Sequence, residues 1–512
     1  MTEISISNNK KIAKNTVILY LRMIFTMVVS LYTTRVFLEA LGVIDYGIYN
    51  VVGGFVAMFG LISGSLSAAT SRFITFELGT GNKERLKKVF SSSVTIQIGL
   101  SIFIIILTEV VGVWFVNNKM VIPEERLVAA NWVLHISVLT FTINLISIPY
   151  NAALIAHERM GIFAFFAILE SVLKLFISFA IVAVSCDRLI FYTILLGVIA
   201  IIIRLLYGAY CKQHFEECSY NFSFDKDVLY KMFSFAGWNM FGAGSAVLRE
   251  QGVNVLLNLF FGATVNSARG VAQQVSGSVV QLANNIMTAV NPQITKNYAL
   301  GDMEYTIRLV FMGARFTMFL LLLMAIPLLC ETETVLRLWL HEVPEYTVVF
   351  VRLVLVYLMV EAVSYSMVTL MLATGDIKKY QIIVGGCQLL NFPLAWIVLT
   401  LGLGPEYTVI VSIIVGTACM ILRLYMLKEM VNFPALKFFK DVYINVWVVA
   451  IVALPLPQII VYWFEDSIIR FLVVCAVSIV TTATSILCIG CNSYERKLLL
   501  LKVHAVVNRQ KR

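Results

Sequence analysis

Long apolar segments alternate with short connections along the whole chain. Each segment is close to the ~20 residues that a helix needs to cross a bilayer, and the connections are too short to form a soluble domain. The pattern predicts an all-α, polytopic integral membrane protein with about fourteen transmembrane helices. The predicted spans are 15–41, 46–70, 89–116, 127–155, 161–185, 189–210, 232–261, 264–292, 307–330, 346–373, 380–402, 406–428, 443–464 and 468–491.

The composition supports a membrane protein, because 60% of the residues are hydrophobic and 13% are charged. Basic residues gather in alternate connections, such as 10–14, 83–88 and the tail 496–512, whereas acidic residues such as Glu124 and Asp187 lie in the others. Basic connections face the cytoplasm in membrane proteins, so both termini are expected there, as an even number of spans requires. The net charge of +9 is explained by this topology, and membrane lipids rather than nucleic acid are the expected surroundings.

A weak internal repeat divides the chain. Segment 71–90 aligns with 291–310, and segment 153–165 aligns with 370–382, both at an offset of about 220 residues. The repeat predicts two lobes of six spans with substrate between them, a common plan in transporters.

The predicted domain boundaries follow from the repeat. They are an N-terminal lobe over 1–210, a cytoplasmic linker over 211–230, a C-terminal lobe over 231–430, and two extra spans with a basic cytoplasmic tail over 431–512.

Several arginines lie inside the predicted spans, where a charge costs about 2.5–3.5 kcal/mol or more and normally faces a cavity or a partner. Arg22, Arg249 and Arg269 have no simple alternative explanation. Arg35 has Glu39 four residues later, a spacing that favours a pair within one helix. Arg423 lies near a helix end, where its side chain is expected to reach the membrane surface.

Two neighbouring spans carry polar stripes at helical spacing. Span 264–292 has Gln274, Gln281 and Asn285 on one face, and span 232–261 includes Glu250. Such a stripe either holds helices together or lines a wet cavity, and two stripes with arginines favour the cavity.

A cavity rich in arginine favours an anionic cargo, because guanidinium groups match phosphate and stay protonated. The chain has no phosphate-binding loop of the G-x-x-x-x-G-K-[ST] type, so ATP hydrolysis is not expected. An inside-negative potential favours outward movement of negative charge by about 2.3 kcal/mol per charge per 100 mV. Glu250, Glu361 and Asp45 are candidates for ion coupling. For Glu361 the coupled ion would be H⁺ or Na⁺, and a hydrogen-bonded structural acid is the alternative. No catalytic residue, metal site or cofactor is expected.

Two stretches resemble a known family. They are LGVIDYGIYNVVGGFVAMFGLISGSLSAATSRFITFELGTGNKERL (41–86) and PYNAALIAHERMGIFAF (149–165). Both are similar to polysaccharide biosynthesis flippases of the multidrug/oligosaccharidyl-lipid/polysaccharide exporter superfamily.

The resemblance implies export of undecaprenyl-diphosphate-linked oligosaccharide repeat units across the bacterial inner membrane by alternating access. Such units feed surface polysaccharides such as the O-antigen of lipopolysaccharide, and other polysaccharide assembly proteins are the implied partners. In related peptidoglycan-precursor flippases, arginines on spans 1 and 8 bind diphosphate. By resemblance these positions fall on Arg22 or Arg35 and on Arg269, and Asp45 corresponds to an acid that follows span 1.

Other functions fit the sequence less well. A cation-coupled multidrug exporter of the same superfamily would need acids in the cavity, for which Glu250 and Glu361 are the candidates. A membrane glycosyltransferase would need a sizeable external domain, and the D-x-D sequence at Asp225 immediately precedes a span, where an aspartate caps a helix.

Overall fold

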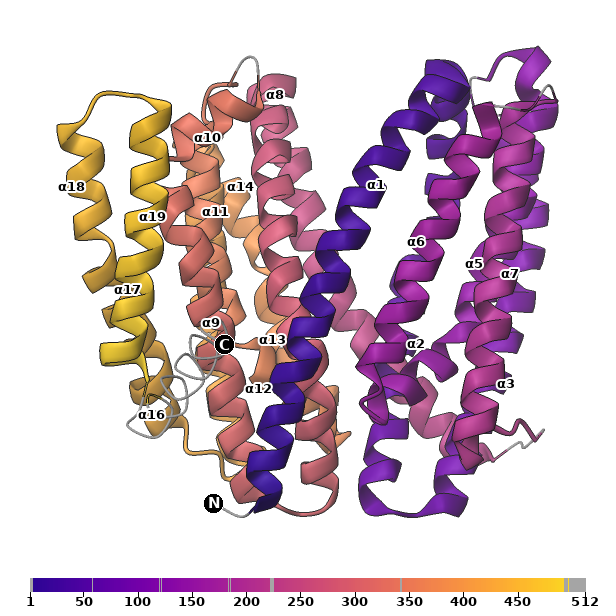
Figure 1. The fold of residues 1–512 in the computed structure, drawn as a ribbon, viewed down its shortest axis with the longest axis horizontal. Coiled ribbons are helices and arrows are strands. Elements are labelled where there is room, and N and C mark those ends of the chain that lie inside the picture. Colours follow the sequence, from indigo (N-terminus) through magenta and orange to yellow (C-terminus); the bar gives the residue numbers. More distant parts are fainter. Residues whose placement is uncertain are drawn as a thin grey trace, which may run out of the picture. The chain divides into compact units, whose positions relative to one another are not determined.

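The computed structural model describes residues 3–57, 59–118, 120, 122–182, 184, 186–221, 225–340, 343–491 and 496. All regular secondary structure in these residues is helical (Figure 1). The all-α prediction is therefore confirmed for the described part of the chain.

The chain folds into two compact units. Unit 1 comprises Met1–Ala243, Thr288–Met303 and Leu372–Lys378. Unit 2 comprises Gly244–Met287, Glu304–Met371 and Lys379–Arg512. The predicted lobes and linker remain predictions.

Unit 1 is built mainly from the first seven helices. Their bounds are α1 Glu3–Ala57, α2 Gly60–Thr80, α3 Lys83–Leu107, α4 Val113–Asn118, α5 Leu127–Ala156, α6 Met160–Val182 and α7 Arg188–His214. A π-helical turn at Thr108–Gly112 joins α3 to α4, and short 3₁₀ turns occur at Glu124–Arg126 and Glu216–Cys218.

Local sequence signals explain where several helices start. The Asn82 side chain accepts a hydrogen bond from the Arg85 amide at the start of α3. Asp187 caps α7 in the same way, and Asp225 caps α8 (Lys226–Ala299). These short polar side chains satisfy amides that have no partner inside the helix. The interpretation of Asp225 as a helix cap is confirmed.

The long helix α1 reverses direction within unit 1. Asp45 pairs with Arg126, which immediately precedes α5, and Phe59, just past the end of α1, packs against Phe141 in the middle of α5. The last part of α1 therefore runs alongside α5. Phe37 and Tyr49 lie on the two sides of the reversal, with ring centroids 4.4 and 5.1 Å from the ring of Tyr192. Helical turns continue through the connection predicted at 42–45, and the chain turns back there as expected. The second predicted span, 46–70, is divided between α1 and α2.

The helix α8 also folds back on itself. A straight helix separates residues 15 apart by about 22 Å, yet Arg269 Nε donates to Asn254 Oδ1 at 2.8 Å. Gln273 Nε2 donates to Glu250 Oε1 at 3.0 Å across the same two arms. Both pairs are centred between residues 261 and 262, which places the reversal between the predicted spans 232–261 and 264–292.

Unit 2 contains the part of α8 around its reversal, Gly244–Met287, and most of the later helices. The bounds are α9 Met303–Cys330, α10 Thr332–Trp339, α11 Thr347–Ala362, α12 Tyr365–Thr374, α13 Lys378–Leu389, α14 Asn391–Thr400, α15 Tyr407–Val431, α16 Ala435–Phe438, α17 Asn445–Ala453, α18 Pro455–Trp463 and α19 Ile468–Ser485. A π-helical turn at Phe439–Ile444 joins α16 to α17, and another at Ile486–Gly490 follows α19.

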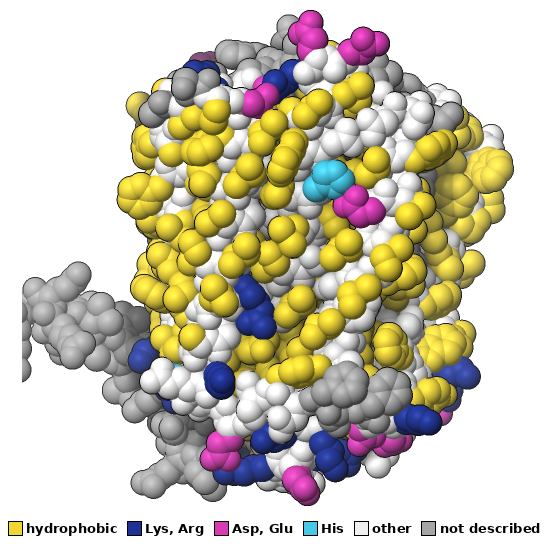
Figure 2. Space-filling model, turned by 90° about the vertical axis from the view of Figure 1, so that its right-hand side faces the viewer, with side chains coloured by type: hydrophobic (Ala, Val, Ile, Leu, Met, Phe, Trp, Pro, Cys, Tyr) yellow, Lys and Arg dark blue, Asp and Glu magenta, His cyan; other side chains and the backbone are white. Residues whose placement is uncertain are grey.

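Ten helical segments in the described residues are long and apolar enough to cross a membrane. They match ten of the predicted spans, and the other four fall in α1, α2 and α8, so the count of fourteen remains a prediction. Figure 2 shows one face on which hydrophobic side chains cover much of the middle, while most charged side chains lie toward the two ends. Exposed Ile106, Val110, Phe176 and Leu205 belong to the spans of unit 1. Such extensive apolar exposure is characteristic of a surface that faces lipid. The protein is therefore a multi-pass membrane protein.

Candidate functional site

The two arms of α8 bring a buried arginine into unit 2. Arg269 is 7% exposed, although its side chain carries a full positive charge. Its Nε binds Asn254, whereas its Nη1 is buried without a hydrogen-bond acceptor among the described residues. A buried donor of a charged group without an acceptor costs free energy that a bound anion would recover.

A second contact lies beside the first, farther from the reversal of α8. The Glu250 carboxylate accepts from Gln273 and remains exposed. The negative charge of Glu250 acts on Arg269, but the Glu250 carboxylate is hydrogen-bonded to a neutral amide in this structure. Arg269 is therefore only partly compensated.

Arg249 connects the first arm of α8 to α11. Its guanidinium carbon lies 5.3 Å from the centroid of the Tyr357 ring. This cation–π contact holds the guanidinium in place and leaves its hydrogen-bond donors available, because the ring face attracts the charge without accepting conventional hydrogen bonds.

An ion pair joins α11 to α15. Arg423 Nη2 lies 3.3 Å from Glu361 Oε1, and the two side chains are 4% and 16% exposed. The other Glu361 oxygen is buried without a hydrogen-bond donor among the described residues. The prediction that Arg423 reaches the membrane surface is wrong, because the buried acid on a neighbouring helix provides a partner within the unit.

A glycine allows α11 and α15 to approach. A Cβ at Gly416 would lie 3.3 Å from the Tyr357 ring and 3.7 Å from Glu361 Oε2. Tyr357 therefore contacts Arg249 and lies near Gly416, which is also close to the Glu361 carboxylate. The resulting cluster contains three guanidinium groups, of Arg249, Arg269 and Arg423, and two carboxylates, of Glu250 and Glu361, so its formal charge is positive.

The remaining predicted residues of the second arm have different surroundings. Gln274 and Gln281 are exposed, whereas Asn285 is 2% exposed. Burial therefore changes along the polar stripe even though the three side chains share one face of the helix.

The predicted residues of α1 lie in unit 1. The Arg22 guanidinium is half-buried, 4.9 Å from the centroid of the Phe163 ring. The Arg35 side chain lies outside the described residues.

Asp45 belongs to an ion cluster at the reversal of α1. Arg126 Nε donates to Asp45 Oδ1 at 2.8 Å, and Arg126 Nη1 donates to Asp187 Oδ2 at 2.6 Å. Burial alone would raise the pKa of Asp187, but hydrogen bonds from Arg126 and from the amides that it caps outweigh burial, so the pKa is lowered. The arrangement links three segments of unit 1 and uses Asp45 as an acceptor for Arg126.

Sequence reasoning missed Tyr357, Gln273 and Gly416, and it missed the pairing of Arg423 with Glu361. The available signal was that Glu361 and Arg423 are opposite charges within apolar spans, where each must find a partner. Nothing in their separation along the chain identifies them as partners.

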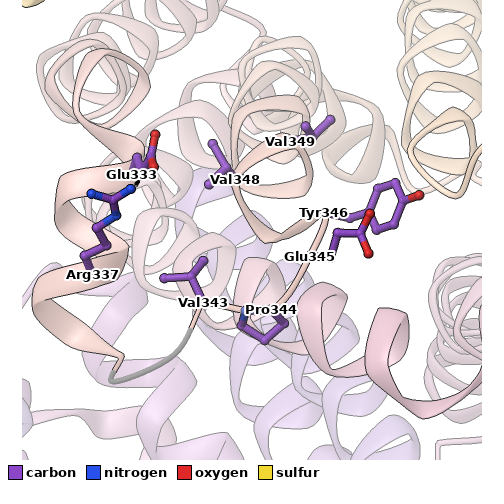
Figure 3. A pocket seen from close by; sticks show the side chains of 8 residues that line it. All are labelled: Glu333, Arg337, Val343, Pro344, Glu345, Tyr346, Val348 and Val349. Carbon is purple, nitrogen blue, oxygen red and sulfur yellow. Dashed lines mark hydrogen bonds and ion pairs between the residues drawn. The ribbon is translucent and has the colours of Figure 1, made fainter.

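A separate hollow of about 510 Å³ lies around the connection between α10 and α11 (Figure 3). Figure 3 shows Arg337 and Glu333 on one side and Glu345 and Tyr346 on the other, with valines between them. None of the predicted site residues lines it, so this hollow is distinct from the arginine cluster.

The chain is similar in sequence to one protein family and in fold to known transporters. A family model described as polysaccharide biosynthesis protein matches residues 10–298. No curated protein matches the sequence. A crystal structure of MATE in the straight conformation is 14% identical with a TM-score of 0.71, and covers 83% of this chain and 97% of its own.

Two further structures show the same likeness. A MOP superfamily transporter from Pyrococcus furiosus, described as having a binding pocket of reverse polarity, is 15% identical with a TM-score of 0.69, and the match covers 83% of this chain and 96% of that one. An outward-facing multidrug resistance MATE family transporter is 14% identical with a TM-score of 0.69, over 82% and 96% of the two chains. At these identities the likeness establishes the fold, which is that of the MATE/MOP transporters.

Proposed function

Because the chain belongs to the polysaccharide biosynthesis protein family, we propose that it is a flippase for lipid-linked oligosaccharides. Its cargo would be undecaprenyl-diphosphate-linked repeat units, exported across the bacterial inner membrane for surface polysaccharide synthesis. Both termini would face the cytoplasm, and other polysaccharide assembly proteins would be its partners.

The buried Arg269 carries the proposal. It is 7% exposed, and one of its donors has no acceptor in the described residues. Desolvating a charge is expensive unless hydrogen bonds or an opposite charge compensate. A diphosphate supplies both, since its oxygens accept hydrogen bonds and carry negative charge. An uncharged sugar or a cationic drug would not neutralise this group.

In the proposed mechanism, Arg269 and Arg249 would bind the diphosphate from the two arms of α8. Arg22 and Arg35 of α1 remain candidates from the sequence for diphosphate binding. Gln274, Gln281 and Asn285 would hydrogen-bond the sugars, while the lipid tail stays in the bilayer. Export of two negative charges would gain about 4.6 kcal/mol per 100 mV from an inside-negative potential.

A cation could be coupled through the acids. The free buried oxygen of Glu361 would accept H⁺ or Na⁺, and cation binding would weaken the bond from Arg423. Glu250 is exposed and offers a second position, whereas Asp45 is bound to Arg126.

The proposal is tested by translocation of a fluorescent undecaprenyl-diphosphate sugar in proteoliposomes. We expect Arg269→Ala to lose transport by at least tenfold, because a charge-assisted hydrogen bond is worth about 1.5–3 kcal/mol. Arg269→Lys keeps the charge and should retain part of the activity. Arg337→Ala removes an exposed arginine of unit 2 and serves as the matched control.

Full transport by a folded Arg269→Ala protein would contradict the role of Arg269 as the headgroup ligand. Folding of each variant is checked by size-exclusion chromatography, and if Arg269→Ala fails to fold, Arg269→Lys carries the comparison.

A cation-coupled multidrug exporter is the alternative function. The exposed carboxylate of Glu250, which accepts a hydrogen bond from the neutral amide of Gln273, is the observation that favours it, because a cationic compound could bind there. Efflux of cationic dyes that is lost in Glu250→Gln, without translocation of the lipid-linked sugar, would establish the alternative.

A further inference from the structure

Unit 1 includes two short segments from the second half of the chain. Thr288–Met303 holds the end of α8 and its turn into α9, and Leu372–Lys378 holds the end of α12 and its turn into α13. Within unit 1 they pack against α2 and against the α5–α6 turn. Segments that are remote in sequence therefore meet at one end of this unit.

The backbones of α2 and α8 are in contact at Gly79. A Cβ added there would lie 2.8 Å from the Lys296 carbonyl oxygen and 2.9 Å from the Ala299 Cβ. Because one obstacle is backbone, only glycine allows this approach. Positions 79 and 299 are separated by the offset that aligns 71–90 with 291–310. Contact between equivalent positions of two repeats is the arrangement that a twofold axis between them produces.

Two polar contacts flank this axis. Arg72 Nη2 in α2 donates to the Ala373 carbonyl oxygen at 2.9 Å. Lys296 Nζ in α8 donates to Glu158 Oε1 in the α5–α6 turn at 3.0 Å.

The repeat relates these two contacts to each other. It aligns 71–90 with 291–310 and 153–165 with 370–382. The Arg72–Ala373 contact joins 71–90 to 370–382, and the Lys296–Glu158 contact joins the aligned segments 291–310 and 153–165. Closure at this end thus uses two symmetry-related contacts with different chemistry.

Both contacts are shielded from water. The Glu158 and Lys296 side chains are 4% and 21% exposed. The Arg72 guanidinium carbon lies 4.6 Å from the ring centroids of both Phe73 and Phe76. Glu158 has a φ of 57°, a backbone conformation that non-glycine residues adopt only when their surroundings hold them there.

We propose that the Arg72–Ala373, Lys296–Glu158 and Gly79–Ala299 contacts form a latch that closes this end of the transporter. The inference rests on the proposed function, in which the lipid-linked anion enters from the cytoplasm, the side predicted for the basic α2–α3 turn. The latch must open for entry and reform before release on the other side. Its three contacts open together, because each one joins α2 or the α5–α6 turn to a segment of the second repeat.

The latch is tested by the reactivity of a cysteine placed behind it. Ala373 is fully buried, so in Ala373→Cys the thiol reacts with a membrane-impermeant maleimide only when the latch opens. Labelling is measured in inverted membrane vesicles, and the labelling of the native cysteines, measured in the parent chain, is subtracted. Glu158→Gln is then added to break the ion pair, and Glu158→Lys with Lys296→Glu to restore it with the charges exchanged.

We expect Glu158→Gln to accelerate labelling about tenfold, the effect of about 1.4 kcal/mol on the opening equilibrium. The charge-exchanged double variant should label slowly, whereas Lys296→Glu alone should label fast. Glu216→Gln, which breaks the exposed Lys83–Glu216 pair of the same unit, is the control and should have no effect.

Equal labelling rates with and without Glu158→Gln in folded protein would overturn the latch. If Glu158→Gln fails to fold, the comparison of Lys296→Glu with the double variant decides. Labelling requires no cargo, so the latch can fail while glycan translocation succeeds. Accelerated labelling in a protein that moves no lipid-linked sugar would instead contradict the proposed function alone.

Discussion

Removal of the Glu361 carboxylate should destabilise the protein through Arg423. Arg423 is 4% exposed on its side chain, and Glu361 is the acid that pairs with it, at 3.3 Å. Breaking a buried ion pair by removing one partner costs about 3–5 kcal/mol, because the remaining charge stays buried. The distance is long for such a pair, so we expect Glu361→Gln to cost about 3 kcal/mol, at the lower end of that range.

The pair can be separated from simple side-chain loss by a double-mutant cycle. The double variant Glu361→Gln/Arg423→Met replaces both charges and leaves no buried unpaired charge. Such replacements often change the free energy of unfolding little. The cycle is measured by thermal unfolding in detergent, with tryptophan fluorescence as the signal. Glu333→Gln breaks an exposed pair within α10 and should leave the melting temperature unchanged.

We expect the wild type to have the highest melting temperature, the double variant an intermediate one and Glu361→Gln the lowest. A Glu361→Gln protein that melts with the wild type would refute the reasoning, as would a double variant whose loss equals the sum of the two single losses. A transporting double variant with unchanged H⁺ and Na⁺ dependence would also show that Glu361 is structural and does not couple transport to a cation.

Two further predictions concern the ion clusters at the ends of the units. The pKa of Asp187 is lowered in the folded protein, so its ion pair with Arg126 stabilises the protein above the unfolded-state pKa, and this contribution is lost as the pH falls through the lowered value. Asp187→Asn should therefore melt below the wild type at neutral pH and approach it under strongly acidic conditions; parallel melting curves at every pH would contradict this. Arg470 binds Glu331, which is 1% exposed, and ties α19 to the end of α9. Arg470→Met should expose the α18–α19 hairpin to limited proteolysis while α9 stays protected, and an unchanged cleavage pattern would show that apolar packing alone holds this hairpin.

Much of the fold could be predicted because membrane helices follow local rules. Apolar length defines the spans, and the short connections predicted at 42–45 and 262–263 coincide with the reversals of α1 and α8. The backbone nevertheless keeps helical turns through both reversals, which the sequence pattern did not predict. A reversal in the chain does not require an end to helical hydrogen bonding.

The site was less predictable, because rotation of each helix and its neighbours decide which charges meet. Arg269 was found from its position in an apolar span, yet the contact with Asn254 depends on the register between the two α8 arms. The burial of Arg423 depends on α11 lying beside α15, a relation that neither span encodes locally. Asp45 was predicted for ion coupling, and its bond to Arg126 follows from the reversal of α1.

The central claim is that the protein moves an anionic lipid-linked glycan, and one measurement tests it most directly. Proteoliposomes containing the wild-type protein would receive a fluorescent undecaprenyl-diphosphate sugar or a cationic dye, with and without an imposed potential. We predict translocation of the glycan, accelerated by a potential that is negative on the side of entry, and no movement of the dye. Dye transport without glycan translocation by the folded protein would contradict the claim.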